Sequence, residues 1–327
     1  QKVKIPDFLA GSPWKRVLNP HYETVKAETD AWIESFDLFK DAKSQDAFER
    51  CQAHQLRVGS DFMALLYAYD EYTDVSDEVQ ARNLANIVVH AMNHPSNARP
   101  SGENPLGEIA RQFWTRALTI LSPSAQRHFL DTFAEYVNSV VQQRHDNAKS
   151  RLRTFDEYWA LRHHNCACLP SFALGELGLD IADDIYNRPP LERMMALAVQ
   201  LICASNDVYS YNVEVLRGMG LFNVVSVVSV VSVVMAEQSM TSTKDAVSWI
   251  GRWNDQLVTE FLAAREELSR LGKSESWSEQ TVGQVETCVD VLGCWVRANE
   301  DWHFESQRHF GTEGAKVQME REVVMLP

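Results

Sequence analysis

The sequence predicts an all-α protein, and three observations support this prediction. Apolar residues recur at intervals of three and four in successive stretches, which is the period of an amphipathic helix. Strand signals are nearly absent. No linker rich in Gly, Ser or Pro divides the 327 residues, of which 45% are apolar, so we expect residues 1–327 to form one large domain.

The expected elements of the first half follow from local signals. Residues 1–22 contain three prolines and a glycine, which predicts an irregular arm. Residues 23–50 predict an amphipathic helix, because their apolar side chains fall near one face. A second helix starts at Leu56 and includes the apolar run that precedes Asp70. Two further helices are predicted over residues 78–93 and 107–121, on either side of a loop rich in turn-forming residues.

The second half continues the helical pattern. Ser122 to Ser124 resembles an N-terminal cap, and the helix after it is expected to run to about Asp146. Residues 154–178 predict a helix that is kinked or broken near residues 165–170, because Pro170 removes a backbone donor and clashes with the preceding turn. The remaining helices are expected from Leu191 to Glu214 and over residues 277–310.

One segment fits this pattern poorly. From Val224 to Val234 the chain repeats Val-Val-Ser, which has the composition of an aggregation-prone strand, and valine is a poor helix former. The run is too short to span a bilayer. We expect it to form a buried helix.

The charge and composition exclude some classes of partner. The formal net charge is −14 and the pI about 5.2, whereas a nucleic-acid-binding protein needs a basic patch. An anionic substrate would require metal ions or an arginine cluster to offset this charge. The six cysteines lack the spacing of a small disulfide-rich domain, no signal peptide opens the chain and no apolar run reaches about 18 residues. We expect a soluble cytoplasmic protein without membrane insertion, either a monomer or a homodimer.

The stretch from Asn206 to Glu214 carries the strongest chemical signal. Asn206, Ser210 and Glu214 recur every four residues, so on a helix they lie on one face. An amide oxygen, a hydroxyl and a carboxylate are hard ligands that suit Mg²⁺ rather than zinc or copper. The alternative is a solvated helix end on which three polar residues align by chance.

A second stretch favours the metal interpretation. Asp70 and Asp74 are again four residues apart, and they follow the apolar helical run over residues 62–69. Two helices that are distant in sequence would then each end an apolar face with metal-type ligands. Facing each other, they would hold a small cluster of Mg²⁺ at the mouth of an apolar pocket.

The order of these motifs resembles that of class I terpene cyclases. The two metal motifs of that family match Asp70 to Asp74 and Asn206 to Glu214, whereas chain-elongating relatives carry a second aspartate-rich motif instead of the latter. Other segments are similar to the fungal sesquiterpene synthases, most closely the Δ6-protoilludene synthase group: Ile5 to Asp7, Leu18 to Tyr22, Arg111 to Trp114, Pro170 to Ala173 and Trp295 to Asn299. The resemblance covers nearly the whole chain. It implies a helical bundle around a central apolar cavity, with three Mg²⁺ ions.

The resemblance also implies roles for residues outside the metal motifs. Arg162 falls where the family has a diphosphate-sensing arginine, and Arg308 and His309 fall where it has an arginine–tyrosine pair that contacts diphosphate. His309 in place of tyrosine would change the tightness or pH dependence of diphosphate binding. These three residues are the catalytic candidates, and a surface position is the alternative for each arginine. The substrate-binding candidates are Arg162, Asn206, Arg308, His309, Phe62, Tyr67, Phe172 and Trp302. Aromatic residues in such positions are more often part of an ordinary core than of a cavity wall.

A group of potential zinc ligands follows Arg162 directly. It consists of His163, His164, Cys166 and Cys168. His164 and Cys168 share a helical face, but His163 does not, and no second ligand pair lies nearby in sequence. We therefore favour the absence of a transition-metal site here.

The expected function is that of a Mg²⁺-dependent sesquiterpene cyclase acting on farnesyl diphosphate. The subgroup likeness implies 1,11 closure to a humulyl cation and a protoilludene-type hydrocarbon. An elongating prenyltransferase is one alternative, but the sequence lacks the second aspartate-rich motif. A catalytically impaired, cyclase-like helical binding protein is the other. It is left open by three departures from the family pattern: the segment between Cys51 and Asp61, which looks short, the repeated Val-Val-Ser units, and His309.

Overall fold

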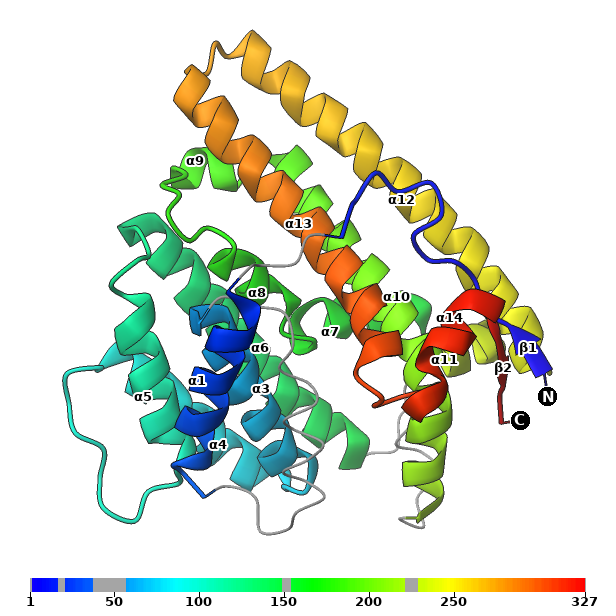
Figure 1. Cartoon of the computed structure of the whole chain (residues 1–327), viewed down its shortest axis with the longest axis horizontal. Coiled ribbons are helices and arrows are strands. Elements are labelled where there is room, and N and C mark those ends of the chain that lie inside the picture. Colours follow the sequence, from blue (N-terminus) through cyan, green and yellow to red (C-terminus); the bar gives the residue numbers. More distant parts are fainter. Residues whose placement is uncertain (1, 17–20, 38–56, 149–153, 221–228, 327) are drawn as a thin grey trace. The chain divides into compact units, whose positions relative to one another are not determined.

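The computed structural model describes residues 2–16, 21–37, 57–148, 154–220 and 229–326, which are coloured in Figure 1. These residues are 74% helical and contain almost no strand, which confirms the all-α class. Backbone contacts divide the chain into two compact units. Unit 1 comprises residues 1–16, 149–166 and 181–327, and unit 2 comprises residues 17–148 and 167–180. The expectation of a single domain over residues 1–327 stays a prediction. None of the described helices combines the length and apolar character needed to cross a bilayer.

Unit 2 is built from six helices among the described residues. They are α1 (Tyr22–Glu34), α3 (Arg57–Asp74), α4 (Glu78–Asn93), α5 (Leu106–Ala117), α6 (Pro123–Ala148) and α8 (Cys168–Leu174). Helix α4 packs against α5 and α6, α3 packs against α1 and α5, and α6 packs against α8 (Figure 1). The predicted bounds of α4 are confirmed, and the first metal motif ends at the last residue of α3, Asp74.

Aromatic side chains fill the core of unit 2. Phe129 lies at the centre, with ring centroids 4.9 Å from Trp114, 5.2 Å from Phe62 and 5.7 Å from Phe133. All four side chains are at most 2% exposed. Such ring pairs stabilise a core by about 0.5–1.5 kcal/mol each beyond the burial of their area.

A buried carboxylate joins three helices of unit 2. Asp61 on α3 is fully buried and accepts hydrogen bonds from Arg57 at 2.8 Å, Arg116 of α5 at 2.7 Å and Thr29 of α1 at 3.1 Å. Burial raises the pKa of Asp61, and the two arginines act in the opposite direction. A buried charge held in this way is costly to remove, because Arg57, Arg116 and Thr29 would all lose their shared acceptor.

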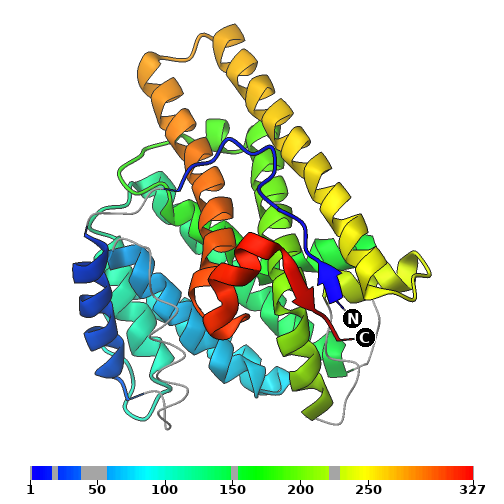
Figure 2. The same cartoon turned by 45° about the vertical axis from the view of Figure 1, so that its right-hand side comes forward.

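Unit 1 is organised around one long helix, α10 (Pro189–Gly220). Helix α10 packs against α12 and α13 as well as against the shorter α7 and α11 (Figure 2). The remaining elements are β1 (Lys2–Lys4), α7 (Phe155–Asn165), α9 (Asp183–Tyr186), α11 (Val230–Glu237), α12 (Thr243–Ser274), α13 (Glu279–Glu305), η1 (Gly311–Glu313), α14 (Gly314–Glu320) and β2 (Glu322–Val324). No element is predicted from sequence for most of α12.

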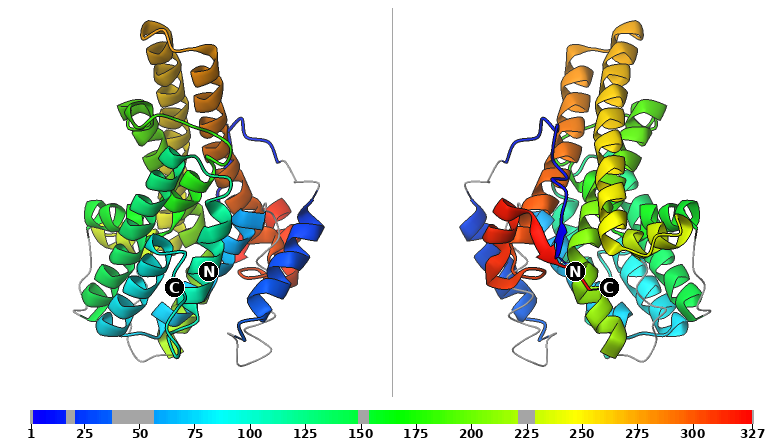
Figure 3. Two further views of the ribbon diagram at one scale, coloured as in Figure 1. Left: turned by 90° about the vertical axis from the view of Figure 1, so that its left-hand side faces the viewer. Right: turned by 90° about the vertical axis from the view of Figure 1, so that its right-hand side faces the viewer.

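The two ends of the chain meet in a small antiparallel sheet. Strands β1 and β2 lie side by side, with Lys2 opposite Val324 and Lys4 opposite Glu322 (Figures 2 and 3). The N-terminal arm is therefore not wholly irregular as predicted. Three residues give too short a pattern to identify a strand, and the partner strand lies at the far end of the sequence.

The predicted helix break after Asn165 is confirmed, although proline is not its immediate cause. Helix α7 ends at Asn165, Ala167 has a φ of 58°, and α8 begins at Cys168. A left-handed backbone at a non-glycine residue interrupts a helix. Pro170 lies in the first turn of α8, where its missing N–H has no partner within the helix to lose.

Two other predictions on unit 1 have different outcomes. Helix α10 continues to Gly220, so the prediction that it ends at Glu214 is wrong, and the second metal motif lies inside the helix. The buried helix expected in the Val-Val-Ser repeat is confirmed for Val230 to Val234, which form the first turns of α11. The earlier part of that repeat, and Cys51 with the start of the segment that looked short, lie outside the described residues.

Candidate active site

The polar face predicted on α10 is present in unit 1. The Ser210 hydroxyl donates a 2.7 Å hydrogen bond to Glu214 Oε1, as side chains four residues apart on one helical face can do. Ser210 is only 4% exposed, and Asn206 and Glu214 are half-buried. The opposite side of α10 carries buried apolar residues such as Val208, which fix the rotation of the helix against its neighbours.

Arg162 of α7 lies against this polar face. Its Nη2 atom donates to Asn206 Oδ1 at 3.2 Å and to Asp207 Oδ1 at 2.8 Å. Helix α7 is fixed at its start by a capping box, in which Thr154 and Glu157 exchange side-chain-to-backbone hydrogen bonds. Arg162, the predicted diphosphate sensor, is thus adjacent to a predicted metal ligand, Asn206. Its role stays a prediction.

Asp207 lies within the second metal motif, but the sequence predicts no role for it. Its Oδ2 atom accepts a hydrogen bond from the Tyr158 hydroxyl and another from the Val230 backbone N–H, the latter at 2.8 Å. Burial, followed by the charge of Asp207, raises the pKa of Tyr158 well above its usual value, so this hydroxyl remains a neutral donor. The only sign of this buried hydrogen-bonding role in the sequence is that Asp207 is acidic and directly follows Asn206.

Asp70 and Asp74 form the corresponding group in unit 2. Both are exposed in the last turn of α3, and Asp74 Oδ1 accepts a 2.6 Å hydrogen bond from Arg144 of α6. The hydroxyl of Tyr69, the residue before Asp70, is buried and has no hydrogen-bond partner among the described residues. Burial raises the pKa of Tyr69. Because these aspartates and the α10 ligands belong to different units, their joint binding of metal stays a prediction.

The third group of candidates follows the end of α13 in unit 1. Trp302 is half-buried, its ring centroid lies 5.5 Å from that of His309, and Arg308 and His309 come directly after the turn at Gln307. His303, which was not predicted, is fully buried, and neither of its ring nitrogens has a hydrogen-bond partner within the described chain. Burial, and then the nearby His309 and Arg308, lower the pKa of His303 well below its usual value, so it is neutral.

A buried network that sequence did not reveal connects both chain ends to α10. Glu300 Oε1 accepts hydrogen bonds from the Tyr209 hydroxyl at 2.8 Å and from Arg321 Nη1 at 2.9 Å. Arg321 Nη2 also donates to Asp7 at 3.2 Å. Burial raises the pKa of Glu300, and Arg321 opposes this shift. The segments that carry Asp7 and Arg321 are therefore held beside the predicted metal-binding face of α10.

The predicted cavity aromatics of unit 2 differ in their surroundings. Phe62 belongs to the aromatic core described above, and Phe172 on α8 is 2% exposed. Tyr67 is only partly buried and packs against the edge of the same core. Phe62 thus has the packing of a core residue, and the substrate-binding role of all three stays a prediction.

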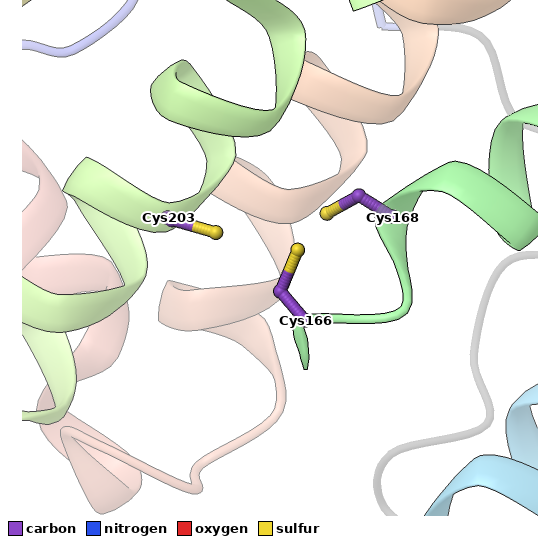
Figure 4. Close-up of side chains that lie close together, drawn as sticks. All are labelled: Cys166, Cys168 and Cys203. Carbon is purple, nitrogen blue, oxygen red and sulfur yellow. The ribbon is translucent and has the colours of Figure 1, made fainter. Parts of the chain in front are cut away.

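Two thiols lie close together in unit 1 near Arg162. Cys166 follows α7, and Cys203 lies on α10 one turn before Asp207. Their Sγ atoms are within 4.8 Å of each other (Figure 4). No disulfide joins them. Sequence inspection missed Cys203 because it is remote from the His-Cys group along the chain. Two thiols fall short of the four ligands of a structural zinc site, and the expected absence of a transition-metal site stays a prediction.

Solved structures share the fold of this chain. The chain superimposes on a-eudesmol synthase with a TM-score of 0.75 and 19% identity, over 89% of this chain and 97% of that one. It superimposes on linalool/nerolidol synthase from Streptomyces clavuligerus, solved with 2-fluorogeranyl diphosphate, with a TM-score of 0.72 and 18% identity, over 89% and 97% of the two chains. The fold is that of the terpene synthases.

Sequence comparisons identify the family. The model of terpene synthase family 2, C-terminal metal binding, matches residues 61–260. A Delta(6)-protoilludene synthase of Stereum hirsutum is 36% identical, over 100% of this chain and 89% of its own length. Sesquiterpene synthase 14 of Postia placenta is 35% identical, over 99% and 92% of the two chains, and a Delta(6)-protoilludene synthase of Armillaria gallica is 35% identical, over 100% and 94%.

The chain belongs to terpene synthase family 2, among the fungal sesquiterpene synthases, and it is a terpene cyclase. The resemblance inferred from its motifs is confirmed. The matched domain is a metal-binding one, which implies that the enzyme uses a divalent metal.

Proposed function

We propose that this cyclase acts on farnesyl diphosphate with three Mg²⁺ ions, closes the chain 1,11 to a humulyl cation and releases a protoilludene-type hydrocarbon. The observation that carries the proposal is the full-length similarity to relatives named Delta(6)-protoilludene synthase. The elongating alternative has no comparable support, because the stretch from Asn206 to Glu214 stands where a second aspartate-rich motif would be required.

The donor atoms on α10 fit Mg²⁺. Ser210 and Glu214 already share one face of the helix with Asn206, and all three supply oxygen atoms. In unit 2, Asp70 and Asp74 present exposed carboxylates at the end of α3. These five residues would hold the ions, and bound Mg²⁺ would draw negative charge onto the departing diphosphate.

The residues of the chain itself would complete the ionisation site. Arg162 places a guanidinium beside Asn206, and Arg308 is the second candidate to bind diphosphate oxygens in a bidentate manner. Carbon–oxygen ionisation needs no side-chain nucleophile or base, since preorganised positive charge stabilises the leaving group. Aromatic faces would stabilise the resulting cation by about 0.5–2 kcal/mol each, and exclusion of water would prevent its capture as an alcohol. The final proton would pass to the diphosphate.

Incubation of the purified protein with farnesyl diphosphate tests this function. Gas chromatography–mass spectrometry should detect a sesquiterpene hydrocarbon in the presence of Mg²⁺ and none after chelation. Asn206→Ala should reduce output by about 100-fold or more, because it removes one preorganised ligand. Asn212→Ala is the matched control, since Asn212 lies on the same helix but bonds to the backbone of Val324 and Leu326 instead.

Three results would contradict the proposal in different ways. Equal output from the parent and Asn206→Ala would exclude the metal assignment. A longer prenyl diphosphate formed only with added isopentenyl diphosphate would identify an elongating enzyme. Binding of farnesyl diphosphate without turnover would identify an impaired, cyclase-like binding protein.

A further inference from the structure

Asp207 lies in the second metal motif but does not share the face of the predicted ligands. It is one residue beyond Asn206, and so it is rotated about 100° around the helix axis. Its side chain is only 3% exposed and faces α7 and α11. We propose that Asp207 is a positioning residue that holds Arg162 at the metal-binding face of α10, so that diphosphate meets an oriented guanidinium. This inference rests on the proposed function.

The contacts of Asp207 make it a fixed support. Tyr158 and Val230 both donate to Oδ2, so the plane of the carboxylate is set by two elements other than the helix that carries it. Oδ1 is thereby directed at Arg162 Nη2 at 2.8 Å. A guanidinium is a planar fork, so fixing one nitrogen at short range limits the orientation of the whole group.

Arg162 retains capacity for another acceptor. Its Nε atom is buried and has no hydrogen-bond partner within the described part of the chain. Burial of an unpaired charged donor is unfavourable, and an incoming acceptor such as a diphosphate oxygen would relieve it. The Nε donor of Arg162 is therefore available to an anionic ligand.

We expect the two hydrogen bonds of Arg162 Nη2 to respond differently when metal and diphosphate bind. Asn206 Oδ1 is both an acceptor for Arg162 and a predicted metal ligand. A cation at that oxygen would repel the guanidinium, so we infer that Arg162 exchanges Asn206 for diphosphate when metal and diphosphate bind together. The bond to Asp207 involves no predicted ligand, so it would persist and keep Arg162 in place.

Asp207 also connects the sensor to the segment after α10. Val230 is the first residue of α11, and its N–H is among those that a helix leaves unpaired at its start. A carboxylate is favoured at that position by the helix dipole. The start of α11 is therefore fixed to the same side chain that orients Arg162.

Titration with inorganic pyrophosphate and Mg²⁺, followed by calorimetry, tests the positioning role without relying on turnover. Asp207→Asn keeps the shape of the side chain but removes its charge. We expect pyrophosphate to bind about tenfold more weakly to this variant. With farnesyl diphosphate, kcat should fall about 100-fold and KM should change little, because misplacing a catalytic group affects the transition state more than substrate binding. Tyr158→Phe removes one donor to Oδ2 and should give a smaller loss of pyrophosphate affinity, about two- to fivefold.

Asp61→Asn is the matched control. Asp61 is equally buried and bonded to arginine, but it lies in unit 2 and contacts no predicted ligand. We expect it to lower the unfolding temperature while leaving pyrophosphate affinity within twofold of the parent.

Unchanged pyrophosphate affinity and kcat in Asp207→Asn would overturn the inference while leaving the proposed function intact. If Asp207→Asn does not fold, unchanged affinity in Tyr158→Phe overturns it instead. A parent protein that binds no Mg²⁺–pyrophosphate and forms no product would overturn the proposed function, and the positioning role with it.

Discussion

Replacement of Arg321 by alanine should destabilise unit 1 strongly. Arg321 donates to Glu300, to the Tyr209 hydroxyl at 3.0 Å and to Asp7. Glu300 is 1% exposed, and its Oε2 atom has no hydrogen-bond partner in the described structure. Arg321 forms an ion pair with the other oxygen, Oε1, and so offsets the buried charge. Breaking a buried ion pair by removing one member costs about 3–5 kcal/mol, because the other charge stays buried.

The loss should depend on pH in a defined direction. Burial raises the pKa of Glu300 while Arg321 opposes the shift, so removal of Arg321 lets this pKa rise further. When the pKa of a carboxyl group is higher in the folded protein than in the unfolded chain, the folded protein is destabilised as the pH rises. The loss begins near the unfolded pKa, about 4.3 for Glu, and is complete above the folded pKa. The penalty should therefore be smaller at pH 5, where Glu300 can take up a proton, than at pH 8.

Urea denaturation followed by circular dichroism at both pH values measures this effect. Arg265→Ala is the control, because the Arg265–Asp290 pair has side chains 40% and 62% exposed and such pairs contribute about 0–1 kcal/mol. A loss below about 1 kcal/mol in Arg321→Ala at both pH values, or a larger loss at pH 5 than at pH 8, would refute the reasoning.

Three further predictions concern single sites. Phe129→Ala should lower the free energy of unfolding by about 3–5 kcal/mol, since it leaves a cavity at the centre of the aromatic core. Denaturant titration checks this loss, which would be small if the core collapsed to fill the space. Gly314→Ala should cost about 1–3 kcal/mol, because its Cβ would lie 1.9 Å from the carbonyl oxygen of Phe304. An unchanged melting temperature would show that α14 shifts freely. Glu214→Ala should raise the Mg²⁺ concentration needed for half-maximal turnover by about tenfold or more, because it removes a charged oxygen ligand. Turnover measured against Mg²⁺ would instead give an unchanged midpoint if Glu214 were not a ligand.

The local features of this protein were predictable from sequence. Helix α4 has its predicted bounds, α3 ends at Asp74, and Ser210 contacts Glu214 as their spacing requires. These features depend on helical period and on capping, which act over a few residues. The break near Ala167 was also predicted, although the φ of that residue and not Pro170 marks its position.

Features that depend on distant partners were not predictable in the same way. The sheet of β1 and β2 pairs the two ends of the chain, and Cys203 approaches Cys166 only because α10 packs against α7. Helix α10 continues past Glu214 to Gly220, because local sequence signals locate the end of a helix only to within a few residues.

The sequence by itself determined the helical class, the two groups of candidate oxygen ligands and the family. Only the tertiary structure decided which buried side chains surround these groups. Asp207 is bonded to Tyr158, Arg162 and Val230. Glu300 is bonded to Tyr209 and Arg321. The physical reason is that a buried charge must find partners wherever the packed helices bring them. The repeating pattern along one helix carries no information about which residues another helix will present.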